Sequence, residues 1–253
     1  MSSLKRMLAV LDLFTSDAPT WNAEAIAAHQ DCSVPTAYRY LRELSDVGLL
    51  RTATTGQYVL GNKIVELDYQ LRRADPLLQA AQRPMRELAR QSECDVALIA
   101  LSSHHLLTIH YESNQAEMRA SYGRGRRMPT FRGAMSLALL SALGKPALRK
   151  LHAANQEEAA TTPGAQDLEQ LSDQLKAIRK AGYATSVGAL DSQNAGFAIP
   201  LLDEQQNVQA SLGFVMSLER FQMLESQRAA QLLRQCAQEI QRSLRSDAQA
   251  GPI

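Results

Sequence analysis

The sequence predicts an α+β protein with two domains: an N-terminal helical domain that ends in a β-hairpin, and a larger C-terminal domain in which helices flank an antiparallel sheet. Three short helical patterns and a hairpin pattern fall within the first 60 residues, whereas strand and helix patterns mix from residue 76 onward. A length of 253 residues also fits two domains, because one domain usually has about 100 to 200 residues. We expect domains at residues 1–61 and 76–253, joined by a helical linker at residues 62–75.

The composition excludes several other classes of protein. Apolar residues make up 45% of the chain and charged residues 21%, which excludes a disordered protein. No apolar run approaches the ~20 residues that a membrane-spanning helix needs. Three widely spaced cysteines fit a reducing compartment better than a disulfide framework. We therefore expect a cytoplasmic protein with no membrane partner.

The first domain begins with a helix over residues 4–14, in which apolar residues recur at helical spacing. Asn22 is suited to cap a short second helix. Ser33 is suited to cap a third helix, which carries Pro35 in its first turn and ends at Gly48.

Two short extended runs, residues 49–53 and 57–60, follow the third helix and are joined by a turn that contains Gly56. They predict a β-hairpin. Three short helices followed by a hairpin are typical of a winged helix-turn-helix, in which the second and third helices form the unit that reads DNA.

The linker helix, residues 62–73, ends before Pro76 because the residue before a proline disfavours the helical conformation. The expected elements of the second domain are, in chain order, a helix over 77–91, strands over 96–101, 106–111 and 117–122, helices over 133–143 and 168–181, strands over 185–189, 197–202 and 209–216, and a closing helix over 219–244. An Ala/Thr-rich loop is expected near residues 157–164.

Motifs in both halves carry a resemblance to a known family. They are TAYRYL at residues 36–41, YVLG at 58–61, GRRMP at 125–129, AGYA at 181–184 and AIPLLD at 198–203. In this order and spacing they resemble the IclR family of bacterial transcriptional regulators, and the resemblance covers essentially the whole chain. It implies a winged-helix DNA-binding domain, a GAF-like effector domain, a homodimer or a dimer of dimers, and no cofactor.

The resemblance also implies a ligand class, because relatives sense small organic acids that are often aromatic. Two departures keep the identity of the effector from being transferred. Ser136-Leu137 stands where the family usually has Gly-Lys or Gly-Arg, and residues 185–188 replace the acidic residues that are common after Gly-Tyr.

The candidate DNA contacts are the exposed positions of the third helix and the hairpin: Ser33, Thr36, Tyr38, Arg39, Arg42, Arg51, Thr54 and Thr55. Arg39 and Arg42 are one turn apart, and an arginine in the major groove pairs bidentately with guanine. The alternative for the two arginines is a solvated helix face. Tyr38 has a partly buried alternative.

The charge of the first domain argues the other way. The whole chain has a formal net charge of +1, and residues 1–60 hold five basic and six acidic residues. Electrostatic attraction alone would therefore bind double-stranded operator DNA weakly. A dimer that doubles the contacts across a palindrome is the expected remedy.

The candidate effector site surrounds the start of the helix at residue 133, where free N–H groups and the helix dipole attract anions. The family resemblance implies that the effector is surrounded by Met118, Ala120, Tyr122, Gly133, Ala134, Met135, Ser136, Ser186, Gln193, Asn194 and Gly196, and Phe131 and Arg132 stand directly before that helix. Arg132 would bind a carboxylate, with apolar walls from Tyr122, Phe131 and Met135. The alternatives are a solvated basic rim for Arg132 and a core position for Met135.

No catalytic or metal-binding pattern stands out. Cys94, His104, His105 and His110 are metal-ligand types, but adjacent histidines on a strand point to opposite faces, and we place His104 and His105 in a turn. The chain also lacks a P-loop and a dinucleotide fingerprint. We expect no metal and no enzymatic activity. Two other classes stay open: an enzyme fused to a winged helix, and an interaction module whose winged helix binds protein.

Overall fold

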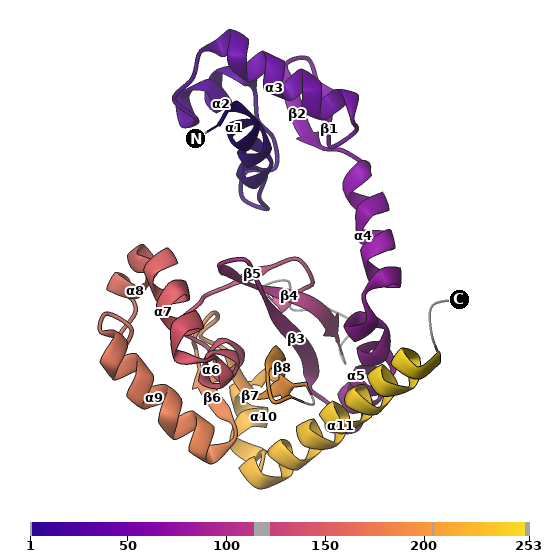
Figure 1. The fold of residues 1–253 in the computed structure, drawn as a ribbon, viewed down its shortest axis with the longest axis vertical. Coiled ribbons are helices and arrows are strands. Elements are labelled where there is room, and N and C mark those ends of the chain that lie inside the picture. Colours follow the sequence, from indigo (N-terminus) through magenta and orange to yellow (C-terminus); the bar gives the residue numbers. More distant parts are fainter. Residues whose placement is uncertain (1, 114–121, 204, 251–253) are drawn as a thin grey trace. The chain divides into compact units, whose positions relative to one another are not determined.

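The computed structural model describes residues 2–113, 122–203 and 205–250 (Figure 1). The chain divides into two compact units, residues 1–75 and 76–253. Each unit is considered by itself. The expected linker helix groups with the first unit.

The first unit contains four α-helices and a hairpin. In chain order these are α1 (Ser3–Ala9), the 3₁₀ turn η1 (Val10–Leu13), α2 (Ala23–His29), α3 (Val34–Asp46), β1 (Leu50–Thr54), β2 (Gln57–Leu60) and α4 (Lys63–Ala74). Both expected caps are confirmed: Asn22 Oδ1 accepts the Ala25 N–H at 2.8 Å, and Ser33 Oγ accepts the Thr36 N–H at 3.4 Å. The first helix tightens into the 3₁₀ turn, whereas the sequence pattern predicted one continuous helix.

The core of this unit is formed by apolar side chains of the first three helices and β1. They include Val10, Ile26, Leu41, Leu44 and Leu50. Trp21 fixes the loop before α2: its Nε1–H donates to the Leu13 carbonyl at 2.9 Å, and its backbone pairs with Tyr58 of β2. The hairpin is therefore held against the helices as one unit.

The second unit is built on a six-stranded antiparallel sheet with the order β5-β4-β3-β8-β7-β6. The strands are β3 (Asp95–Ser102), β4 (His105–Glu112), β5 (Arg127–Met128), β6 (Ala184–Val187), β7 (Asn194–Leu202) and β8 (Val208–Ser217). Most of the strand expected at 117–122 lies outside the described residues. Its last residue, Tyr122, lies in a helical turn and not in a strand.

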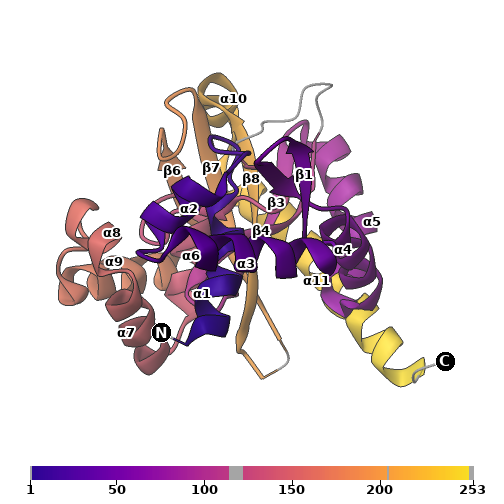
Figure 2. The same ribbon diagram turned by 90° about the horizontal axis from the view of Figure 1, so that it is seen from above.

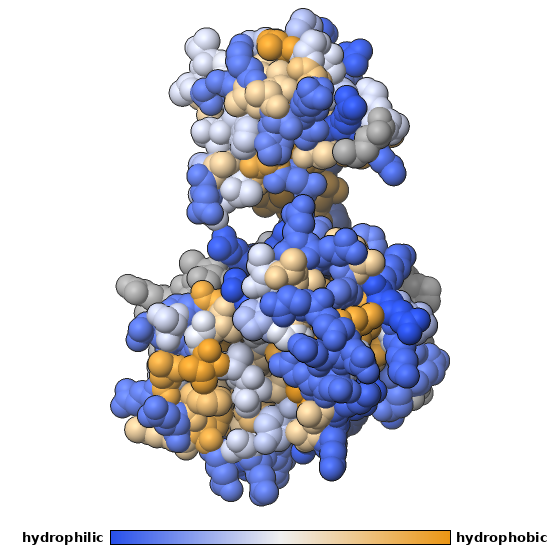
Figure 3. Space-filling model, turned by 90° about the vertical axis from the view of Figure 1, so that its left-hand side faces the viewer, coloured by the Kyte–Doolittle hydropathy of each residue, from blue (hydrophilic) through white to orange (hydrophobic). Residues whose placement is uncertain are grey.

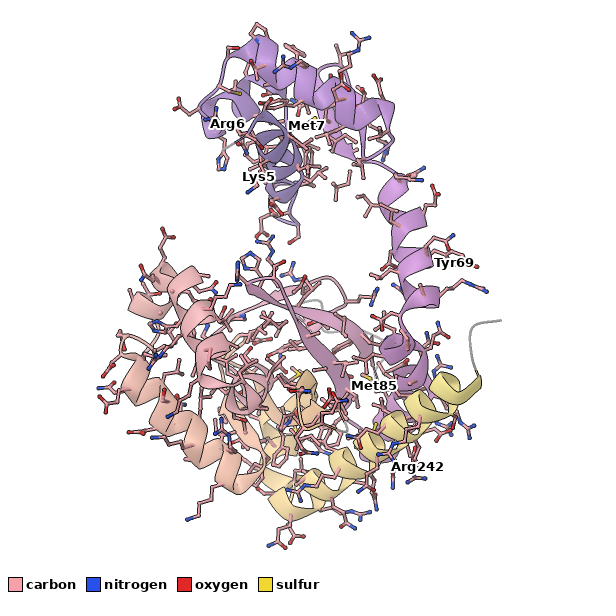
Figure 4. The ribbon with its side chains drawn as sticks, viewed as in Figure 1. Lys5, Arg6, Met7, Tyr69, Met85 and Arg242 are labelled. Carbon is pink, nitrogen blue, oxygen red and sulfur yellow. The ribbon has the colours of Figure 1, made fainter. Side chains whose placement is uncertain are left out.

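Helices cover both faces of this sheet (Figures 1 and 2). They are α5 (Pro76–Ser92), α6 (Ala134–Ala142), α7 (Lys145–Ala154), α8 (Gln156–Thr161), α9 (Leu168–Ala181), α10 (Leu218–Met223) and α11 (Ser226–Ala250). One buried core joins α5 and α11 to one face of the sheet, and a second core joins α6, α7 and α9 to the other. Met85 lies in the first of these cores, on the inward side of α5 (Figure 4).

Two expectations for this unit were wrong. The loop expected near residues 157–164 is largely helix α8. The closing helix is two helices, α10 and α11, because the chain is extended at Leu224, where α10 ends. Helix α7 was not predicted from the sequence.

Helix α6 lies very close to the sheet. Eight of its nine residues are buried, so it is apolar all round, as a helix enclosed on every side must be. Gly213 of β8 permits this approach, since a Cβ there would lie 2.8 Å from Met135 Cγ and from Ala198 Cβ. In the part of the chain that is described, no helix has the length and apolar character needed to cross a membrane.

Candidate DNA interface and effector site

The exposed side of α3 and the hairpin enclose an open groove of about 670 Å³. Its lining comes from both elements: Tyr38, Arg39, Arg42, Glu43, Ser45 and Asp46 of α3, with Thr52 and Tyr58 of the hairpin. Tyr38 is 46% exposed, so it is not part of the core. The structure thus brings the predicted Tyr38, Arg39 and Arg42 together on one surface.

The two arginines of this groove are held only loosely. Arg42 Nε lies 3.8 Å from Asp46 Oδ2, and the two side chains are 81% and 65% exposed. An ion pair so exposed contributes little and does not fix the side chain. The Arg39 guanidinium lies 5.8 Å from the centre of the Tyr40 ring. Both arginines are therefore accessible to an incoming partner.

The other predicted contacts fall into two groups. Ser33 and Thr36 bond to each other through their hydroxyls at 2.9 Å, so their first role is to cap α3. Arg51, Thr54 and Thr55 are exposed on the hairpin, whose turn is made by Gly56 at φ +74°. Thr52 and Tyr58 were missed as groove residues. They are paired across the predicted hairpin, and this pairing was the available signal.

The second candidate site lies at the N-terminus of α6. Gly133 precedes the helix at φ +90°, a conformation that favours glycine. The Ala134 N–H donates to Ser186 Oγ at 2.9 Å, and the Ser136 hydroxyl donates to the Pro129 carbonyl at 2.6 Å. Gly196 lets β7 pass this turn, since a Cβ there would lie 3.1 Å from Ala134 Cβ.

A small cavity at this turn gathers most of the predicted effector residues. It is lined by Tyr122, Met128, Arg132, Gly133, Ala134, Met135, Ser136, Ser186, Ala189, Leu190, Asn194 and Gly196. Arg132 is exposed at its rim, and Met135 is both buried and part of the wall. Met128, Ala189 and Leu190 were missed. Leu190 had a signal, an apolar residue within a polar loop.

Two predicted residues do not line this cavity, and two lie outside the described residues. Phe131 is buried against His152, with ring centroids 5.4 Å apart. Gln193 is exposed, and its amide donates to Ser192 Oγ at 3.4 Å. Met118 and Ala120 are the two beyond the described residues.

The loop between β6 and β7 closes the cavity. Leu190 Cδ1 lies 3.4 Å from the position a Gly133 Cβ would take. The Asp191 carboxylate accepts from Asn194 Nδ2 at 2.7 Å and from the Gln193 N–H at 3.0 Å, which holds the loop in place. The remaining volume among the described residues is about 10 Å³, enough for one water molecule at most. A ring-sized ligand therefore requires residues of the cavity wall to move.

The candidates for metal or nucleophilic chemistry are not assembled into a site. The described residues contain no group of three or more His, Cys, Asp or Glu side chains placed to hold a metal ion. His104 lies in a turn, whereas His105 begins β4, and His110 Nε2 lies 3.0 Å from Glu112 Oε1. Burial raises the pKa of the Cys94 thiol, which keeps it protonated and unreactive.

The first unit is an exposed helix-turn-helix with its hairpin, and the second is a sheet domain that encloses a cavity. Together they define the class of winged-helix transcriptional regulators with a second, sensory-type domain. The chain belongs to the IclR family of these regulators. The family described as "IclR helix-turn-helix domain" matches residues 3–53. The family described as "Bacterial transcriptional regulator IclR C-terminal" matches residues 70–242.

Individual relatives agree with this assignment. The chain is 21% identical over 216 residues to the HTH-type transcriptional regulator KipR of Bacillus subtilis, covering 85% of this chain and 86% of KipR. It is 24% identical over 227 residues to the p-hydroxybenzoate hydroxylase transcriptional activator of Acinetobacter baylyi, covering 88% and 83%. The matched families and relatives are regulators, so the chain is not an enzyme.

A solved structure also matches along the whole chain. It is an IclR homologue from Microbacterium hydrocarbonoxydans, crystallised in complex with 4-hydroxybenzoate. Its TM-score to this chain is 0.78 at 25% sequence identity, covering 97% of this chain and 100% of that one.

Proposed function

We propose that operator binding by this regulator is controlled by a small organic acid, of the aromatic carboxylate type, bound at the N-terminus of α6. The observation that carries this proposal is the cavity itself. It combines a helix N-terminus and the nearby Arg132 with apolar walls from Tyr122, Met128 and Met135. A carboxylate suits the first two, and a ring suits the walls.

The Ser186 hydroxyl adds a polar group to this arrangement. Its oxygen already accepts the Ala134 N–H, so its own hydrogen is directed elsewhere and can donate to a carboxylate. Two similar proteins support the aromatic class of ligand. One is named the p-hydroxybenzoate hydroxylase transcriptional activator, and the other was crystallised with 4-hydroxybenzoate.

On the DNA side, we propose that α3 enters the major groove of double-stranded operator DNA in the cytoplasm. Arg39 and Arg42 would read guanine, while Ser33, Thr36, Arg51, Thr54 and Thr55 contact the backbone. Glu43 and Asp46 share the groove with the arginines and weaken its attraction for DNA. In the alternative, the groove binds protein and not DNA. Operator binding whose affinity falls with rising salt would exclude that alternative.

A second copy of the chain would double these contacts, and α4 offers a surface for it. None of its residues is buried, and Val65, Leu67, Tyr69 and Leu71 are 70%, 49%, 55% and 55% exposed. Tyr69 projects from the helix into solvent (Figure 4). Figure 3 shows another face of this unit, on the side away from α4, where small apolar areas lie among hydrophilic residues. Exposed apolar side chains gathered on one short helix favour an interface there.

The charges of α4 favour an antiparallel copy of the same helix as the partner. The first half of α4 carries Lys63, Glu66 and Asp68, one positive and two negative charges, whereas Arg72 and Arg73 end the helix. In the single chain Glu66 pairs with Lys63 and Asp68 with Arg72, so these ion pairs would be shared with or exchanged for pairs to the second copy. Antiparallel pairing sets the acidic half of one helix against the basic end of the other. We therefore propose a homodimer through α4, with a dimer of dimers as the larger assembly.

Thermal unfolding in the presence of 4-hydroxybenzoate, benzoate and short aliphatic acids tests the effector proposal. A ligand at 100 times its Kd stabilises by about 2.7 kcal/mol, which raises the Tm of a unit of this size by roughly 5–10 °C. Arg132→Gln should abolish the shift, whereas Arg149→Gln, an exposed arginine on α7, should keep it. No shift with any acid, or a full shift in Arg132→Gln, would overturn the proposal.

A further inference from the structure

The exposed face of α3 carries an apolar strip at its N-terminal end. Val34 is the first residue of the helix and is 37% exposed; Tyr38, one turn later, is 46% exposed. Residues four apart share a helical face, so Val34, Tyr38 and Arg42 form one line along α3. The remaining exposed residues further along the helix, such as Arg39, Glu43 and Asp46, are charged.

Residues other than Val34 form the buried side and the cap of α3. The buried side of α3 is formed by Ala37, Tyr40, Leu41 and Leu44. The capping of the helix is done by Ser33. An isolated exposed valine is ordinary on most surfaces. This one, however, lies at the end of the helix that a helix-turn-helix presents to base edges.

We propose that Val34 reads a thymine in each operator half-site by packing against the 5-methyl group of that base. The proposal rests on the DNA binding proposed above. The thymine methyl is the apolar group that base edges display in the major groove, and small aliphatic side chains are its partners. A polar or charged residue at Val34 would lose this contact.

The geometry of α3 also limits where this thymine lies. A helix rises about 1.5 Å per residue, so Val34 and Arg42 are about 12 Å apart along the axis. Base pairs are about 3.4 Å apart. The thymine therefore lies within about four base pairs of the base that Arg42 contacts.

The test begins by selecting duplexes from a random library with the full-length chain. In the selected operator, each thymine is then replaced singly by deoxyuridine, which keeps the base pair and removes only the methyl group. Dissociation constants are measured by fluorescence anisotropy at one salt concentration, for the natural chain, Val34→Ala and Val47→Ala. Val47 is a matched control, because it is 59% exposed and lies at the opposite end of α3.

At one thymine per half-site, deoxyuridine should raise the Kd of the natural chain and of Val47→Ala about fourfold, the effect of one methyl-sized apolar contact. The same replacement should raise the Kd of Val34→Ala clearly less, because the alanine methyl lies farther from the base, and Val34→Thr, which keeps one γ-methyl, should be intermediate. Equal sensitivity of Val34→Ala at every thymine, or no sensitive thymine at all, overturns this inference and leaves the proposed function standing. Failure to select any duplex overturns both.

Discussion

Gly213→Ala tests the close approach of α6 to the sheet. The added Cβ would lie 2.8 Å from Met135 Cγ and Ala198 Cβ, and 2.9 Å from the Phe197 carbonyl oxygen. Real Cβ atoms do not come so close, so helix or sheet must shift. Such overpacking costs about 1–3 kcal/mol, and replacing glycine by alanine returns about 0.4–1 kcal/mol through the unfolded chain. From the middle of these two ranges, the net loss in free energy of unfolding is about 1–2 kcal/mol.

The only tryptophan makes this measurement specific to one unit. Trp21 lies in the first unit, so tryptophan fluorescence follows that unit, while far-UV circular dichroism follows both. A loss of 1–2 kcal/mol lowers the Tm of a unit of this size by roughly 2–8 °C. The dichroism transition of the second unit should shift by this amount, with the Trp21 transition unmoved.

Gly144→Ala is the matched control. Gly144 has φ −66°, and its nearest neighbour would lie 3.8 Å from the new Cβ, so the change should stay within about 0.5 kcal/mol of the natural chain. If Gly213→Ala is as stable as Gly144→Ala, the packing of α6 against β8 described above is wrong.

Three further predictions follow from other features. Arg39→Ala should weaken operator binding by about 1–3 kcal/mol in an anisotropy titration and leave the carboxylate-induced thermal shift intact; an unchanged operator affinity would mean that α3 is not the reading helix. Leu71→Asp should raise the Kd of the dimer at least tenfold in sedimentation equilibrium, whereas Gln70→Asp on the same helix should leave it unchanged. Burial raises the pKa of the Cys236 thiol to about 12 from an ordinary 9.0, so above pH 9 the unfolded chain binds fewer protons than the folded one. Stability should therefore fall as pH rises from about 9 to 12, and Cys236→Ala, followed by urea unfolding at each pH, should flatten that fall.

Local signals were sufficient for much of the first unit. Asn22 and Ser33 mark the starts of their helices, because a cap is a contact within four residues. The hairpin is predicted by its glycine turn. The second unit shows the limit of such signals. Nothing in the amphipathic pattern after residue 218 marks the extended residue Leu224. For α8 a local signal was present but overlooked, because Gln, Glu and Ala, which make up most of residues 156–161, are good helix formers.

The candidate effector site shows the same limit for side chains. Phe131 precedes the first residue of α6 by only three residues, yet it packs against His152, a contact that depends on where α7 packs. Gln193 and Asn194 are neighbours in the chain but differ in position. Asn194 begins β7 and lines the cavity, whereas Gln193 does not line it. Strand register decides between them, and register is set by pairing with distant residues.

The exposure of α4 has a consequence for how a signal could pass along the chain. A helix of 12 residues with no buried side chain has little to hold it together, because isolated helices of that length are marginal in water. Its ion pairs, Lys63 with Glu66 and Asp68 with Arg72, add only tenths of a kcal/mol each. In a lone chain α4 is therefore expected to be only marginally stable, and a helix that unfolds transmits no strain. If two chains pair through α4 as proposed, the partner would stiffen this helix, and effector binding would then alter DNA binding only above the protein concentration at which chains pair.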